Sequence, residues 1–221
     1  YAAILSGSRG AWLALPIAGL FYLWVFRRCI AWRMFAVAVI ALTVFVFALP
    51  SNYINKRISK IERNTRLFVT GQQVNTSEGE RLMLWQIAVS VWREHPFIGT
   101  GIGDFHYETK RKIESGQTRL DYVYGHAHNI FLDALATTGL LGLSALVVAF
   151  FIVPVRIFLY FGFESTVKRA DLPVLAGLTH LICFAVFGLT EGWLARSPMV
   201  SVFIFGLLVF VSSAALGGKD A

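Results

Sequence analysis

Residues 121–142 read DYVYGHAHNIFLDALATTGLLG, and the organisation of the chain can be worked out from this stretch. It begins with polar residues, among them His126, His128 and Asn129, and then passes into a long apolar run. Imidazole changes its protonation state near neutral pH more readily than other side chains. Histidines at a point where water would meet hydrocarbon therefore suggest chemistry on a substrate that has one end in a membrane.

The composition of the chain predicts an integral membrane protein. Of the 221 residues, 56% are hydrophobic and 15% are charged, and the mean hydropathy is +0.63. A soluble domain needs a polar shell, whereas a bilayer does not demand one. The net charge of +7 is then better explained by cytoplasmic loops and anionic headgroups than by nucleic acid. The chain begins with Tyr1 rather than Met, so we expect a piece of a longer protein.

The apolar segments predict an all-α bundle, a single integral-membrane domain over residues 1–221 that crosses the bilayer about five times. A helix needs roughly 17–25 apolar residues for each crossing. The expected spans are residues 10–26, 31–49, 130–155, 172–190 and 198–216. The third span is long enough to tilt, or to bend at Gly139, Gly142 or Pro154.

The basic residues orient these spans. If the five spans alternate, most short-loop cations fall on one side: Arg27, Arg28, Arg33, Arg156, Lys168, Arg169 and Lys219. The positive-inside rule makes that side cytoplasmic. Arg9, a long loop over residues 51–128 and the turn at residues 191–197 then share the outer face.

The outer loop is predicted to be partly helical. Apolar residues recur at helical spacing over residues 80–94, and one face of that helix carries Trp85, Ala88, Val89 and Trp92. Ser77 and Glu80 have the spacing of a capping box. Pro96 ends this helix, the glycines of residues 99–103 form a tight turn, and a short helix is expected over residues 107–114.

Three interpretations fit His126 and His128. They could ligate a metal ion, but two histidines at positions i and i+2 with no third ligand are weak evidence, and we expect neither a metal nor another cofactor. They could cap the third span, with Asn129 as its N-cap. One of them could be a general base, which needs a pKa near neutrality and access to a hydroxyl group. Capping and catalysis both remain open from these residues alone.

Two arginines on the outer face are candidates for binding phosphate. Arg9 lies in the segment SGSRG before the first span, and Arg81 opens the outer helix. A guanidinium group matches the geometry of phosphate with two parallel hydrogen bonds. Plainer explanations exist for both, since Arg9 could extend to lipid headgroups and Arg81 could be a solvated charge or a partner of Glu78.

Three further polar residues have less specific predicted roles. His180 lies in the middle of a span, where we expect it to join two helices by a hydrogen bond. Asp133 and Glu191 are carboxylates at the predicted membrane edge. Asp133 follows Asn129 by about one helical turn and could orient an imidazole or pair with an arginine.

Several sequence blocks together resemble the O-antigen ligase superfamily. They are SRGAWL at residues 8–13, Arg81 with Trp85, HPFIGTGIGDF at residues 95–105, and HAHNIFLDALATTGLLGL at residues 126–143. Their order, spacing and membrane setting also fit. The resemblance covers nearly the whole chain and corresponds to the C-terminal half of such proteins.

This resemblance implies a metal-independent, inverting glycosyltransferase of lipopolysaccharide biosynthesis. The O-antigen would move from undecaprenyl pyrophosphate to lipid A-core, at the periplasmic face of the bacterial inner membrane. On matching positions, Arg9 and Arg81 would bind the pyrophosphate and His128 would act as the base, with His126 as a second candidate. An O-antigen polymerase or a protein O-oligosaccharyltransferase would share the fold. A lipid-linked glycan transporter or a non-catalytic membrane component is the alternative of another class.

Overall fold

The structure is a computed structural model that describes residues 9–25, 37, 59, 77–164 and 172–217. Within these residues all regular structure is helical and no strand occurs, which confirms the predicted all-α class. The span expected over residues 31–49 and the first part of the outer loop lie outside the described residues, apart from Val37 and Ser59.

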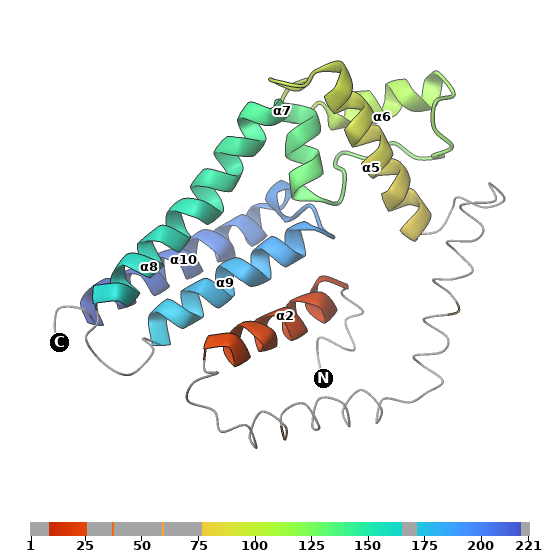
Figure 1. The fold of residues 1–221 in the computed structure, drawn as a ribbon. Helices are drawn as coiled ribbons and strands as arrows, with labels where there is room; N and C mark the ends of the chain where they lie inside the picture. Colours follow the sequence, from red (N-terminus) through yellow and green to blue (C-terminus); the bar gives the residue numbers. More distant parts are fainter. Residues whose placement is uncertain (1–8, 26–36, 38–58, 60–76, 165–171, 218–221) are drawn as a thin grey trace.

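Apolar helices form an elongated bundle (Figure 1). Helix α2, Arg9–Val25, packs along α9, Leu172–Gly188, and α9 packs along α10, Ser197–Gly217. Helix α8, Val153–Glu164, packs against both α9 and α10. Among the described residues, Ile130–Phe161 and Ser197–Leu216 are long and apolar enough to cross a membrane, while α2 and α9 contain shorter apolar helices.

Polar side chains inside the bundle join neighbouring helices. Thr179 Oγ1 of α9 lies 3.1 Å from the Tyr22 hydroxyl of α2. His180 Nε2, also on α9, lies 3.0 Å from the Phe203 carbonyl of α10, which accepts its hydrogen bond. Interhelical hydrogen bonds of this kind help apolar helices to associate where burial from water contributes little. The role predicted for His180 is confirmed.

The segment expected as a third span is divided at Gly139. Helix α7 covers Ile130–Val147, but Gly139 has φ 63° and ψ −164°, and the chain turns sharply there (Figure 1). After the turn the helix runs through a π-helical segment, Val148–Ile152, into α8. The bend therefore occurs at the first of the three expected points. The described helical path reaches Glu164, beyond the predicted end at residue 155.

The loop after α5 holds this bend in place. Backbone hydrogen bonds run from the Leu140 N–H to the Pro96 carbonyl at 2.9 Å, and from the Gly101 N–H to the Thr137 carbonyl at 2.8 Å. At Gly99 and at Gly139, an added Cβ would overlap the backbone of the opposite segment, and both residues have positive φ. Only glycine permits both the close approach and the conformation. The sequence block at residues 95–105, which contains Gly99, and the block at residues 126–143, which contains Gly139, therefore pack against each other as one structural unit.

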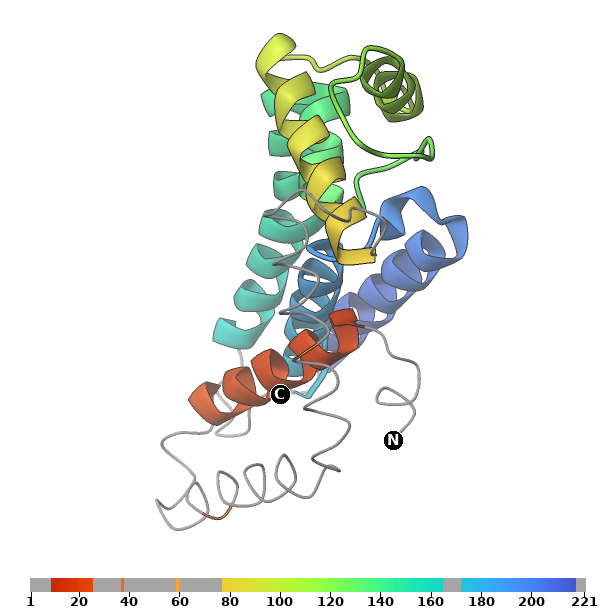
Figure 2. The ribbon, with the colours of Figure 1, turned by 90° about the vertical axis from the view of Figure 1, so that its right-hand side faces the viewer.

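Helices α5, Ser77–Glu94, and α6, Phe105–Glu114, pack over the first segment of α7 (Figures 1 and 2). Both were predicted within a few residues. The buried face of α5 differs from the predicted one: Leu84, Ile87 and Val91 are buried with Ala88, whereas Trp85, Val89 and Trp92 lie at the margin and are half-buried. Two overlapping apolar stripes on one helix both satisfy the helical period, so spacing alone does not select between them.

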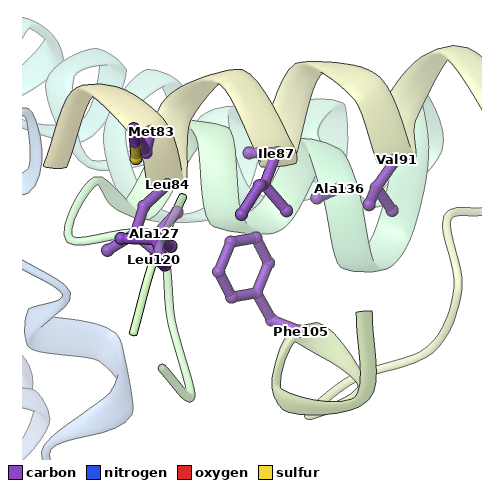
Figure 3. Close-up of a cluster of buried hydrophobic side chains, with 9 residues drawn as sticks. Met83, Leu84, Ile87, Val91, Phe105, Leu120, Ala127 and Ala136 are labelled. Atoms are coloured by element: carbon purple, nitrogen blue, oxygen red, sulfur yellow. The ribbon is translucent and has the colours of Figure 1, made fainter. Parts of the chain in front are cut away.

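Two hydrophobic clusters meet beside the histidines. The first fills the space between α5, α6 and α7, where the Phe105 ring points from α6 toward Ile87 of α5 (Figure 3). The second lies inside the bundle and contains Ile130, Phe158, Val174, Leu181, Trp193, Phe203 and Ala214. Ala127 belongs to the first cluster and Ile130 to the second. His128 and Asn129 therefore lie at the boundary between two packed units.

Candidate functional site

Three segments far apart in the sequence meet at this boundary: the first turns of α5, the loop before α7, and the turn between α9 and α10. The α9–α10 turn carries Glu191, whose N–H donates to the Phe187 carbonyl at 2.8 Å. The buried indole of Trp193 donates to the Phe184 carbonyl at 3.0 Å. These bonds fix the turn to the end of α9 and direct the Glu191 carboxylate toward α5.

Arg81 reaches this turn from α5. Its Nη1 donates to the Thr190 carbonyl at 2.6 Å, and its Nη2 donates to Glu191 Oε1 at 2.7 Å. The two side chains are 20% and 31% exposed, so the ion pair is partly shielded from solvent. A residue more than a hundred positions later in the chain thus supplies the carboxylate that Arg81 binds.

His128 lies beside the same carboxylate. Its Nδ1 is 3.9 Å from Glu191 Oε2, which is too long for a hydrogen bond. Within the described part of the chain, this buried nitrogen has no hydrogen-bond partner. The His128 backbone has φ 51°, a left-handed conformation that costs on the order of 1–3 kcal/mol for a residue other than glycine. Its surroundings must therefore hold it in place.

Asn129 and Asp133 provide that support. The Asn129 side-chain oxygen accepts from the N–H groups of Phe131 and Leu132, at 3.0 and 3.1 Å, which confirms Asn129 as the N-cap. Asp133 Oδ1 accepts from the Ala127 N–H at 2.8 Å. Asp133 thus binds the backbone between the two histidines by a hydrogen bond and interacts with the His126 imidazole electrostatically, and both side chains shape the loop that presents His128.

His126 packs against His128 and against the α9–α10 turn. The two imidazole centroids are 4.4 Å apart with the rings inclined by 51°. On its other side, a Cβ added at Gly192 would overlap the His126 ring, so the absence of a side chain there makes room for the imidazole. Its Nε2 is buried and has no hydrogen-bond partner among the residues that the structure describes. Buried side-chain atoms without a described partner also occur in and after α5, at Trp85, Trp92 and Thr100, but only at the histidines are two of them on adjacent imidazoles.

The electrostatic setting keeps His128 neutral. Burial lowers the pKa of His128 to about 4, and His126 and Arg81 contribute in the same direction while Glu191 opposes them. This pKa lies below the near-neutral value expected from the sequence: at pH 7 the imidazole is neutral and has a lone pair available, but in this state it is a weak base. The nearby Tyr124 ring meets His128 edge-on, and burial with a hydrogen bond to Glu80 raises the pKa of Tyr124 to about 12. The Tyr124 phenol therefore stays protonated.

Two further arginines bear on the site. Arg196 is 56% exposed and its Nη2 lies 4.0 Å from Glu191 Oε2. Arg9 begins α2, and its side chain lies outside the described structure. Because Tyr22 contacts Thr179 and the two helices run in opposite directions, the Arg9 end of α2 lies toward the same end of the bundle as the α9–α10 turn (Figures 1 and 2).

The structure brings Arg81, His126 and His128 together, three of the four residues proposed from sequence. Sequence reasoning missed Glu191 and Arg196 as members of this cluster. One sequence signal could have found them: if the five predicted spans alternate across the membrane, the turn at residues 191–197 lies on the same face as the histidines.

Comparison with known proteins establishes the family. A sequence model of the family described as O-antigen ligase matches residues 1–147. This chain belongs to the O-antigen ligase family. The match includes Arg81, His126 and His128 and confirms the resemblance seen in the sequence blocks. Together with the long apolar helices, membership in the O-antigen ligase family identifies an integral membrane protein.

One similar protein is an uncharacterized protein of Haemophilus influenzae (strain Rd). It is 23% identical to this O-antigen ligase family chain over 213 residues, covering 94% of the chain and 52% of the relative. The chain thus spans about half the length of the curated relative that it matches. Glu191 and Arg196 lie within the chain but beyond the residues that the O-antigen ligase model matches.

Proposed function

We propose that this protein transfers an O-antigen glycan from undecaprenyl pyrophosphate to a sugar hydroxyl of lipid A-core, without a metal ion and with inversion at the anomeric carbon. The observation that carries this proposal is the convergence of Arg81 and His128 on one carboxylate, Glu191, at the junction of the outer helices and the apolar bundle. A phosphate-binding group and a neutral base at a membrane edge are what transfer from a lipid pyrophosphate needs.

Arg81 would bind the leaving group. Pyrophosphate departs readily once its charge is held, and guanidinium groups hold phosphate oxygens with paired, charge-assisted hydrogen bonds. Arg196 is close enough to Glu191 to join Arg81, and the family resemblance adds Arg9. In the reaction the bond between the anomeric carbon and the pyrophosphate oxygen breaks, and its electron pair stays on that oxygen.

His128 would activate the acceptor. The acceptor hydroxyl attacks the anomeric carbon from the side opposite the pyrophosphate, and its proton passes to the imidazole of His128. A single displacement of this kind inverts the anomeric configuration. The imidazolium then releases the proton to water or to the departing pyrophosphate. General-base catalysis of this type contributes about 10²–10⁴ in rate.

A periplasmic location in the inner membrane is part of the proposal. The cations of the short loops, such as Arg27, Arg28, Lys168 and Arg169, support a cytoplasmic side opposite the histidines. Lipid-linked donor and lipid A-core would then both reach the site from the outer leaflet, with their lipid tails in the bilayer.

Reconstitution in liposomes tests the proposal. The protein is supplied with an undecaprenyl-pyrophosphate-linked glycan and lipid A-core, with and without EDTA, and the products are separated by size and analysed by NMR. We expect glycan on lipid A-core, inverted at the new linkage and unaffected by EDTA. Longer lipid-linked chains would instead indicate a polymerase, and glycan on an added acceptor protein would indicate an oligosaccharyltransferase. Absence of transfer to any acceptor would contradict an enzymatic role and favour a transporter or a non-catalytic component.

A further inference from the structure

Glu191 contacts both halves of the proposed site. Its Oε1 accepts the hydrogen bond from Arg81 at 2.7 Å. Its Oε2 faces His128 Nδ1 at 3.9 Å and Arg196 Nη2 at 4.0 Å, and accepts no hydrogen bond from the described residues. Glu191 Oε1 is therefore already hydrogen-bonded, while Oε2 lies just beyond hydrogen-bond distance of His128 Nδ1, a buried nitrogen that has no partner among the described residues.

Donor binding changes the charge balance of this cluster. In the resting protein, Glu191 offsets part of the positive charge of Arg81 and Arg196, and His128 is neutral. A pyrophosphate diester brings two negative charges, and its oxygens compete with the Glu191 carboxylate for the same guanidinium group. The Glu191 carboxylate and the phosphates also repel each other. The arriving donor therefore weakens the bond between Glu191 and Arg81.

We infer that Glu191 is a positioning residue that exchanges partners when the donor binds, releasing Arg81 to the pyrophosphate and accepting a hydrogen bond from His128 Nδ1. This inference rests on the proposed function. The exchange needs only a small movement, because shortening the present 3.9 Å separation to a hydrogen bond requires a shift of about 1 Å.

The new hydrogen bond would prepare His128 for catalysis. With Nδ1–H donated to a carboxylate, the imidazole is held in the tautomer that leaves the Nε2 lone pair free for the acceptor proton. A carboxylate partner at one ring nitrogen also makes the other nitrogen more basic. The base would thus become strong only when a donor occupies the site, which limits proton transfer in its absence.

The groups around His128 support this direction. Arg81 faces it from α5, His126 and Tyr124 from its own loop, and Arg196 and Glu191 from the α9–α10 turn. Of the described charged groups that shift the pKa of His128, Glu191 alone raises it, while burial, His126 and the two arginines lower it. Neutralising the arginines with pyrophosphate and bringing Glu191 closer both act to raise that pKa.

The pH dependence of transfer in wild-type and Glu191→Gln proteins tests this exchange. The pH profile of kcat/KM reports groups in the free enzyme and that of kcat reports groups in the donor complex. In the wild type we expect the acid limb of kcat/KM near pH 4 and the acid limb of kcat at least one pH unit higher, since activity requires the neutral imidazole. In Glu191→Gln the separation between the two limbs should be smaller, because only the charge of the pyrophosphate is left to raise the pKa of His128, with kcat about 10- to 100-fold lower and donor affinity retained. Glu191→Asp should recover part of the separation.

A second measurement is independent of turnover. NMR of ¹³C/¹⁵N-labelled histidine reports the tautomer and pKa of His128 with and without a non-transferable undecaprenyl pyrophosphate analogue. A donor-induced rise in that pKa that is clearly smaller in Glu191→Gln than in the wild type supports the exchange. An equal rise in both proteins, or an equal separation of the pH limbs in wild type and Glu191→Gln, overturns it. Failure of the wild type to transfer glycan at all would instead contradict the proposed function, so the two failures are distinguishable.

Discussion

Glu94 and Glu191 both bind an arginine, but their surroundings differ. Glu94, at the end of α5, accepts hydrogen bonds from Arg111 and Lys112 of α6, each at 2.5 Å. These bonds hold the pKa of Glu94 at about 2 and tie the two helices together. Both oxygens of Glu94 are used. This cluster satisfies its charges and serves the fold.

The Glu191 cluster is incomplete by comparison. One of its oxygens binds Arg81, the other stops short of His128, and the two histidines keep buried nitrogens without described partners. A buried polar atom without a partner costs about 1–3 kcal/mol, so such an arrangement lowers stability. Proteins accept that cost mainly at functional sites. The contrast is consistent with a structural role for the Glu94 pair and supports the proposal that the Glu191 cluster binds a ligand.

The largest effect is expected from removing the base. His128→Asn deletes the imidazole, while asparagine tolerates the left-handed backbone that this position requires. We expect the rate of glycan transfer to fall about 10²–10⁴-fold in liposomes, with donor affinity nearly unchanged. Lys110→Ala, on the exposed side of α6, serves as the control and should leave transfer intact. Transfer by His128→Asn within tenfold of the wild-type rate would remove His128 as the base.

The bend at Gly139 should be the most sensitive point for stability. Gly139→Ala forces a Cβ into the Phe97 backbone at a φ and ψ that essentially only glycine adopts, so we expect a loss of about 3 kcal/mol or more. Gly19→Ala is the matched control, because no atom lies within 4 Å of a Cβ added there. Thermal unfolding in detergent measures both, and equal midpoints for the two variants would refute the account of the bend.

His126 should contribute less to transfer than His128. Its ring fills the space left by Gly192 and borders His128, so His126→Ala would loosen the loop rather than remove the base. We expect a loss of transfer of about tenfold, with the acid limb of kcat/KM moved to higher pH because His126 lowers the pKa of His128. A loss as large as that of His128→Asn would mean that the base has been assigned to the wrong imidazole.

The smallest effect concerns the Glu94 cluster. The pKa of Glu94 lies below its ordinary 4.5, so its stabilisation is present above about pH 4.5 and is lost as pH falls toward 2. The carboxylate is 37% exposed, and solvent screening limits its contribution to under about 1 kcal/mol. Thermal midpoints of wild type and Glu94→Gln should therefore differ slightly at pH 7 and converge near pH 2. A constant difference across this range would show that the pair is not electrostatic in origin.

Local signals predicted much of the fold. The bounds of α10 follow from apolar length and from neighbouring Gly and Pro residues, and the end of α5 follows from Pro96; these signals act within a few positions. Asn129 as N-cap also followed from its position before an apolar run. The buried face of α5 did not, because its partners, such as Phe105 and Leu120, come from elements that a single helix does not specify.

The centre of the site depended on contacts that sequence spacing does not encode. Arg81 and Glu191 lie on different elements more than a hundred residues apart, and no local pattern links them. Asp133 illustrates the same limit: its distance from Asn129 suggested an imidazole or arginine partner, but its hydrogen bond is to the Ala127 N–H, and it meets the His126 imidazole only electrostatically. Residue types and membrane topology were enough to predict candidate base and phosphate-binding residues. Which of these groups face each other depends on tertiary packing, which the sequence pattern does not show.

Donor affinity in a matched pair of arginine variants tests the central contrast most directly. Binding of an undecaprenyl pyrophosphate analogue is measured for Arg81→Ala and Arg111→Ala in nanodiscs, together with their thermal midpoints. We predict that Arg81→Ala binds the analogue about 10- to 100-fold more weakly, since a hydrogen bond to a charged group contributes about 1.5–3 kcal/mol, while Arg111→Ala binds like the wild type. Unchanged affinity in Arg81→Ala, or equal losses in both variants, would contradict the assignment of the Glu191 cluster to the donor.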